Sequence, residues 1–334
     1  MLTKKENFLE TIKINGTPDR LVNHYEMCKM IIPDPVLMAG LAGIQKGEEG
    51  FDPWGSAVAW PEDQPNSVPH PTPDNLVIKD IETWRDAVKI PEVSTDPDDW
   101  AQAKAMVDEV DKNEYLATGF FAPGLFERVH RLMGFENAFI SMLEEPELFQ
   151  ELVDTIAADR LKNLQILVEK TRPDMVLSHD DWGTKLSLFM SPDNWREFFK
   201  PHYADIYAYL KSEDIIVMHH ADSFLEPIIE DMVEIGIDVW QGALPENDIS
   251  KLQKQLAGRM TLMGGTDAGI IDRTNSTEEE IRKEVRRACA EYGPAGHFIP
   301  SVTYGGPDDV IYPHVLPIVQ DEIRQYNKEV YGIE

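Results

Sequence analysis

The stretch from Ile215 to Gln241, IIVMHHADSFLEPIIEDMVEIGIDVWQ, decides the fold. It begins with a short apolar run that ends in two histidines and continues into a helical pattern from Glu226 to Ile235. A second short run, Ile237–Gln241, closes it. Two short apolar runs separated by one helix are typical of a βα unit, whose strands lie parallel. The stretch therefore predicts an α/β fold with a parallel sheet.

The same alternation continues over the chain from about residue 110 onward. In addition to Ile215–His220 and Ile237–Gln241, the candidate strands are Leu21–Met27, Tyr115–Phe121, Met175–Asp180, Met260–Gly265 and His297–Ser301. The other helical patterns are Pro146–Glu169, Pro192–Lys211, Ile249–Leu256 and Thr277–Tyr292. Repeated βα units predict a (β/α)8 TIM barrel, and barrels of this length fold as one unit, so we expect a single domain over residues 1–334.

Residues 51–75, FDPWGSAVAWPEDQPNSVPHPTPDN, interrupt this pattern because they are rich in proline and turn-forming residues. The segment nevertheless carries Phe51, Trp54 and Trp60, which a disordered linker has no reason to contain. We expect a long N-terminal excursion beside the barrel mouth, with a small hairpin in it.

The composition limits the class of partner. Lys plus Arg number 31 against 60 Asp plus Glu, which gives a formal net charge of −29. Such a charge repels nucleic acid and anionic membranes, and it disfavours a polyanionic substrate unless several cations line the site. The two cysteines, Cys28 and Cys289, are too far apart to suggest a disulfide framework. The charged N-terminus resembles no signal peptide, and no stretch approaches the roughly 20 apolar residues of a membrane span, so we expect a cytoplasmic protein.

Polar residues gather where the predicted strands end. Catalytic groups of a (β/α)8 barrel lie at the carboxyl ends of its strands, so these positions are the best candidates for a site. They are Tyr25, Glu26, His179, Asp180, Asp181, His219, His220, Asp222, Gln241, Thr266, Asp267, Ser301, Thr303 and Tyr304. We select Asp181, Asp180, Glu26 and Tyr304 as candidate catalytic residues.

His220 and Asp222 are the candidate metal ligands. They are two residues apart and share one side of an extended chain, where an imidazole and a carboxylate can bind one divalent cation. The alternative is a structural pair, in which His220 packs against Asp222 or a backbone carbonyl and Asp222 or Ser223 caps the next helix. His219 points the opposite way, and we expect it to be buried between sheet and helices.

Asp180 and Asp181 are adjacent, so an extended backbone directs only one of them toward the mouth. That carboxylate can orient substrate, bind a metal or donate a proton if burial raises its pKa. The alternative is loop capping before Trp182. Glu26 has a similar alternative, an ion pair with Lys29.

Two known signatures are absent. The run Gly264-Gly265-Thr266-Asp267 has neither phosphate-loop spacing, so it predicts only a tight turn. No G-x-S-x-G elbow occurs, and nucleophilic hydrolase chemistry is unsupported.

Several segments together resemble the uroporphyrinogen decarboxylase superfamily. They occur in the same order and cover most of the chain from residue 124 onward: GLFERVHRLMGFENAFISMLEEPEL, DDWGTKLSLFMSPDNWREFFKPHYADIYAYL, MHHADSFLEPIIEDMVEIGIDVWQ, MTLMGGTDAG and HFIPSVTYGGPDD. The resemblance implies a (β/α)8 barrel with its site at the strand carboxyl ends.

The resemblance also has two departures. True uroporphyrinogen decarboxylases carry an arginine-rich RQAGRY-like segment that binds substrate carboxylates, and the matching VNHYEMCKM here has no arginine. Members that serve methanogenesis bind zinc through a His-x-Cys segment and a later Cys. Here the histidine is His220, Asp222 replaces the first thiolate, and Ser301 to Thr303 replace the second. A zinc site of that type is therefore incomplete, whereas a His/Asp site for a divalent metal stays possible.

The DDWG segment followed by SPDNWREFFKP looks most like a branch associated with corrinoid-dependent demethylation of methyl ethers or amines. The resemblance implies a methyltransferase that uses a corrinoid on a partner protein, with His220, Asp222 and Asp181 holding a metal or the leaving group, and a homodimer is a possible assembly. Phe120, Phe121, Trp182 and Tyr304 are candidate walls of the mouth, or ordinary packing. The alternatives are a decarboxylase or other lyase acting on a small carboxylate, and a barrel that binds without turnover.

Overall fold

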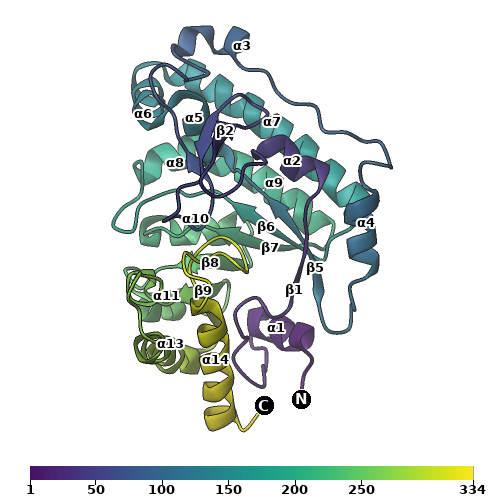
Figure 1. Ribbon diagram of the computed structural model, residues 1–334, viewed down its shortest axis with the longest axis vertical. Coiled ribbons are helices and arrows are strands. Elements are labelled where there is room, and N and C mark those ends of the chain that lie inside the picture. The colour runs from purple at the N-terminus through teal and green to yellow at the C-terminus, as the bar shows by residue number, and fades with distance from the viewer. Residues whose placement is uncertain (334) are drawn as a thin grey trace.

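A curled parallel sheet of seven strands forms the centre of the protein (Figure 1), whose computed structural model describes residues 1–333. The strands are β1 (Cys28–Ile31), β5 (Leu116–Phe121), β6 (Met175–His179), β7 (Ile216–His220), β8 (Val239–Ala243), β9 (Thr261–Gly265) and β10 (Phe298–Ser301). They pair in this order, each parallel to the next. Side chains of the first and last strands pack into one inner cluster, as Met30 and Ile299 show, because the sheet curls around it.

Helices separate successive strands and cover the outer face of the sheet (Figure 1). The α-helices are α1 (Lys4–Ile12), α2 (Pro35–Gly40), α3 (Trp84–Ala87), α4 (Ala101–Asp108), α5 (Leu125–Met133), α6 (Phe135–Glu144), α7 (Pro146–Thr171), α8 (Pro192–Phe198), α9 (Lys200–Ser212), α10 (Ile229–Glu234), α11 (Ile249–Leu256), α12 (Ala268–Ile271), α13 (Glu278–Tyr292) and α14 (Val315–Tyr331). Short 3-10 turns are η1 (Ile81–Thr83), η2 (Glu226–Ile228) and η3 (Gly293–Ala295). The α/β class with a parallel sheet is thereby confirmed.

The prediction of a strand over Leu21–Met27 is wrong. This segment is a turn, and the first strand begins at Cys28. The backbone at His24 has a φ of 53°, which breaks an extended chain. The imidazole of His24 bonds the Ser301 hydroxyl over 2.7 Å and the Pro307 carbonyl over 2.8 Å. Val22, Tyr25 and Met27 of the segment reach the inner cluster, which explains its strand-like pattern.

The sheet has seven strands where eight were expected. Over residues 1–333, no backbone pairing joins β1 to β10. The segment before β1 contacts β10 through the His24 side chain instead. At the amino ends of the strands, α1 places Phe8 in the inner cluster, and the Thr11 carbonyl bonds the His297 ring over 2.9 Å. The curled sheet is thus filled inside and covered at its amino end.

The helical pattern Pro192–Lys211 forms two helices, α8 and α9, where one was expected. The break lies at Phe199, whose φ is −119°. Pro201 follows two residues later, and proline has no N–H to continue the helical hydrogen bonds.

The N-terminal excursion contains a small antiparallel sheet, which confirms the expected hairpin. Its strands are β2 (Glu49–Phe51), β3 (Ala57–Ala59) and β4 (Val68–Pro69). The excursion is attached to α5 by a buried ion pair, in which Arg128 Nη1 lies 2.5 Å from Asp52 Oδ2. The second Arg128 nitrogen donates to the Gly40 carbonyl over 2.6 Å, and the guanidinium lies over the Trp54 ring. This ion pair therefore fixes the excursion against the start of α5.

Two absences expected from the sequence hold for the described chain. Through residue 333, none of the helices combines the length and apolar character needed to cross a membrane. Cys28 and Cys289 are both free.

We predict that Asp52→Asn lowers the free energy of unfolding by about 3–5 kcal/mol, because it leaves the buried Arg128 charge unpaired. Glu151→Gln is the control, since it breaks an exposed ion pair with Arg85 and should cost about 0–1 kcal/mol. Urea unfolding measures both. Equal effects of the two changes would show that the Asp52 ion pair does not hold the excursion.

Candidate functional site

Three polar side chains lie at one level where neighbouring strands end. His179 is aligned with His220 in the pairing of β6 with β7, and His220 with Gln241 in the pairing of β7 with β8. His179 and His220 each come two residues after an inner-cluster residue, Leu177 and Met218, and so share its side of the strand. The three polar groups therefore lie above the inner core, at the carboxyl end of the sheet.

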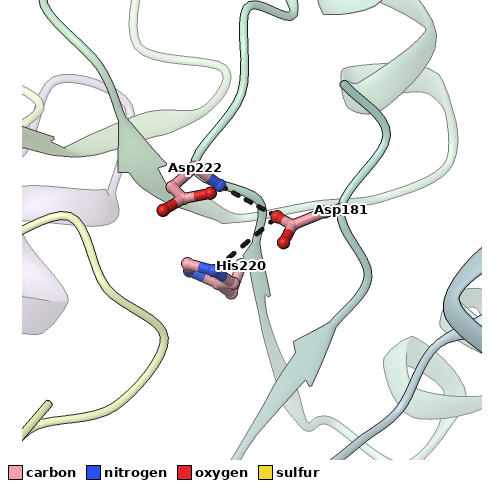
Figure 2. Close-up of side chains that lie close together, drawn as sticks. All are labelled: Asp181, His220 and Asp222. Carbon is pink, nitrogen blue, oxygen red and sulfur yellow. Dashed lines mark hydrogen bonds and ion pairs between the residues drawn. The ribbon is translucent and has the colours of Figure 1, made fainter. Parts of the chain in front are cut away.

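Two carboxylates join His220 at this position (Figure 2). One ligand atom each from Asp181, His220 and Asp222 can be chosen so that all three lie within 4.8 Å of one another. His220 Nε2 is 3.8 Å from Asp181 Oδ1, and the Asp222 backbone N–H donates to that same oxygen over 3.1 Å. Three residues predicted from strand ends are thus brought together, and we call them the His220 cluster.

A glutamine fixes the tautomer of His220. Gln241 Nε2 donates to the carbonyls of Val302 and Tyr304 over 3.3 Å and 2.9 Å, so the Gln241 amide oxygen must face the histidine. That oxygen lies 2.5 Å from His220 Nδ1, which must then carry the proton. The lone pair of His220 is left on Nε2, which is the atom beside Asp181. This is the support that a metal-ligating histidine normally receives from the residues behind it.

The charges of the cluster are poorly compensated. Burial raises the pKa of Asp181 to about 6 although 29 % of its side chain stays exposed; the His179 charge opposes this rise and Glu127 adds to it. Burial and the Asp181 charge raise the pKa of Asp222 well above its ordinary value. Burial and the neighbouring His179 lower the pKa of His220, so the ring stays neutral near pH 7. Two acidic side chains with raised pKa values beside a neutral imidazole lone pair form a site that a cation stabilises, because a bound cation favours their charged forms.

A charged pair, His179 and Glu127, lies next to the cluster. His179 Nδ1 is 3.1 Å from Glu127 Oε1, and the rings of His179 and His220 are 4.3 Å apart. Burial alone would lower the pKa of His179, but the Glu127 carboxylate raises it to about 9. The His179 charge in turn holds the pKa of Glu127 below its ordinary value, against the effect of burial. A protonated imidazole therefore lies beside the His220 cluster.

The sequence places His179 at a strand end but gives no signal for Glu127. Glu127 lies on α5, where an acid in a first turn is typical of an ordinary helix start. Its role as partner of His179 depends on how α5 is placed over the end of β6, which no local pattern encodes.

Asp180 points away from the His220 cluster. It is fully buried and accepts hydrogen bonds from the backbone N–H groups of Phe126 and Glu127, from the Tyr203 hydroxyl and from the Trp182 indole. These bonds hold the first turn of α5. Of the two adjacent aspartates, Asp181 therefore faces the site, and Asp180 supports a helix.

Glu26 and Tyr304 take different positions. Because β1 starts only at Cys28, Glu26 lies at the amino end of the sheet, where it accepts from the Asn23 N–H and faces Arg20 rather than Lys29. The structure thus separates Glu26 from the His220 cluster. Tyr304 lies near the cluster and binds Gln241 through its carbonyl.

The residue after Tyr304 packs directly on the histidines. A Cβ atom at Gly305 would lie 2.7 Å from His179 Cδ2 and 3.3 Å from His220 Cδ2, so only glycine fits there. His219, as expected, is buried on the other side of β7, where it stacks on Trp182 and bonds the Tyr207 hydroxyl over 2.7 Å. Ser223 donates to the Gly183 carbonyl, and no side chain caps η2, so the capping alternative is not observed.

The fold and the site define an α/β protein with a polar cluster at the carboxyl end of a curled parallel sheet. Residues 54–315, well over half of the chain, match the family model described as uroporphyrinogen decarboxylase (URO-D). The chain belongs to the uroporphyrinogen decarboxylase family. No curated protein matches the sequence. Among solved structures, a methyltransferase from Methanosarcina mazei is similar with a TM-score of 0.59 and 16 % identity, over 97 % of this chain and 100 % of that one.

The adjacent aspartates give a matched test of the two positions. We predict that Asp180→Asn lowers the free energy of unfolding by about 2–4 kcal/mol, because the amide nitrogen faces buried donors that need an acceptor. Asp181→Asn should change it by less than about 1 kcal/mol, since it removes carboxylate repulsion at a partly exposed position. Urea unfolding monitored by tryptophan fluorescence measures both. A larger loss for the Asp181 change would reverse the assignment.

Proposed function

We propose that this protein is a methyltransferase that moves a methyl group between a small methyl ether or amine and a corrinoid carried on a partner protein. The observation that carries the proposal is the His220 cluster, whose neutral Nε2 and two carboxylates form a ligand set for a divalent cation. Family membership and the methyltransferase named among similar structures support the same class. The resemblance to the corrinoid-dependent branch supports the finer reaction, and it also supports the closed (β/α)8 barrel that we propose for the family fold.

The residues present fit a divalent metal by their chemistry. One imidazole nitrogen and carboxylate oxygens are ligands that catalytic zinc sites accept, with one position left for substrate. No thiolate takes part, so harder cations that prefer oxygen also suit the cluster. A bound cation would supply a Lewis acid for the oxygen or nitrogen from which the methyl group departs.

The chain itself contributes three functions to this reaction. Gln241 holds the His220 ring so that Nε2 faces the site. Asp181 and Asp222 hold the opposite charge to a metal or to a cationic substrate group. His179 keeps a proton, and thus a positive charge, beside the place where negative charge develops on the leaving group.

We predict that protein purified without chelators contains stoichiometric divalent metal and that His220→Ala loses it, because the cluster then has no nitrogen ligand. Elemental analysis measures the metal, and methyl transfer to a corrinoid protein should be lost with it. His202→Ala is the control, since that histidine pairs with Asp154 elsewhere on the surface. Unchanged metal and unchanged methyl transfer in His220→Ala would remove this role. Metal-free wild-type protein that releases carbon dioxide from a small carboxylate would favour the lyase alternative.

Gln241 gives a second and independent test. We predict that Gln241→Leu weakens metal binding by about 10- to 100-fold, the usual effect of removing the partner that orients a ligating histidine. The control is Gln253→Leu, because Gln253 also donates to two buried backbone carbonyls, those of Tyr292 and Gly296, away from the cluster. Titration with Zn²⁺ against a competing chelator measures the affinity. Equal loss in both variants would show a general packing effect.

A further inference from the structure

One buried arginine on α5, Arg131, has two nitrogens without a hydrogen-bond acceptor in the described part of the chain. Arg131 is 7 % exposed, and its Nε and Nη1 atoms are buried without a hydrogen-bond acceptor among residues 1–333. A guanidinium stays charged at all physiological pH values and offers five N–H donors. Leaving such a group unpaired away from water costs stability, so its presence calls for an explanation.

Arg128, three residues earlier on the same helix, shows what a structural arginine looks like here. It is also buried, but Asp52 and the Gly40 carbonyl accept from it. Arg160, on α7, also lacks a hydrogen-bond partner on its buried Nη2 atom, yet it lies against the Phe121 ring at 3.5 Å. Arg131 has neither an acceptor nor an aromatic face.

Arg131 lies one helical turn beyond Glu127, the α5 residue that contacts His179 next to the candidate site. Arg131 follows Glu127 by four residues, so the two side chains start on the same face of α5, about 6 Å apart. Glu127 contacts His179, and His179 lies against His220. The Arg131 charge is also among the groups that lower the pKa of Glu127. Because Glu127 is already paired with His179, it leaves the Arg131 charge without a partner of its own.

We infer that Arg131 binds a carboxylate of the substrate, so that the methyl donors of this enzyme are small methyl ethers or methylamines that carry one carboxylate group. The inference rests on the proposed methyltransferase function and names its substrate class. A carboxylate matches the planar fork of a guanidinium with two parallel hydrogen bonds. A ligand group with one negative charge is favoured over a phosphate dianion. Arg131 is one uncompensated cation, and the chain as a whole carries a net charge of −29.

Calorimetry with matched acid and amide pairs tests this inference. The probes are methoxyacetate and 4-methoxybenzoate, each compared with its neutral amide, on the protein as purified and without a corrinoid partner. At least one acid should bind about 10- to 100-fold more tightly than its amide, the range for charge-assisted hydrogen bonds. Arg131→Met should abolish this preference, Arg131→Lys should keep part of it, and Arg85→Met, which changes an exposed arginine, should keep all of it.

A second readout separates a binding role from a structural one. Without ligand, Arg131→Met should melt at the same temperature as wild type or higher, because an unpaired buried charge is removed. A lower melting temperature of Arg131→Met, or failure of that variant to fold, would assign Arg131 to the fold and overturn the inference. An acid preference that persists at wild-type strength in Arg131→Met would overturn it too. Equal binding of every acid and amide would overturn it as well.

Failure of this inference is distinguishable from failure of the proposed function. The binding measurement needs neither methyl transfer nor the partner protein. Carboxylate binding through Arg131 without any methyl transfer would reject the methyltransferase and keep the anion site. Methyl transfer from neutral and anionic donors at equal rates would reject the anion site alone.

Discussion

The buried Asp180 carboxylate is the group on which the site depends. Its oxygens accept from the first backbone N–H groups of α5 and from the Tyr203 hydroxyl, which joins the end of β6 to α5 and α9. The contact is so close that a Cβ atom on Gly124 would lie 2.1 Å from the Asp180 Cβ. This sets where α5 starts and, through that, where Glu127 meets His179. A carboxylate that takes no part in the His220 cluster thus determines the charge beside it.

The strands of the sheet can be predicted from local sequence. How the first and last strands come together cannot. Apolar runs such as Ile215–His220 are strands because their alternate residues fill either the inner cluster or the helical layer. Leu21–Met27 has the same alternation, yet the backbone turns at His24, where contacts with Ser301 and Pro307 hold a positive φ. Those partners lie almost 300 residues away in sequence, so local pattern could not predict this turn.

The same distinction applies to the candidate site, where local sequence predicts the position of some residues and not of others. Asp181, His220 and Asp222 could be placed together because each follows a strand of one parallel sheet. Which of the two adjacent aspartates faces inward could not be predicted, since it depends on α5 lying above β6. Glu127 and Arg131 belong to a helix, and a helix gives no hint of which face will lie over the strand ends. Their positions follow only from tertiary packing.

The distribution of charge reconciles an acidic protein with an anionic ligand. The net charge of −29 is carried by the surface as a whole, and it repels a polyanion at long range. Close to the site, salt screens little and the buried charges dominate the local field. There Glu127 is paired with His179, and Asp52 with Arg128, whereas Nε and Nη1 of Arg131 have no acceptor among residues 1–333. One such cation can pair with one carboxylate, whereas a porphyrinogen carries many carboxylates and would need several cations. The absence of an arginine-rich N-terminal segment and the unpaired arginine on α5 therefore both support the proposal that this member of the family acts on a small monoanion.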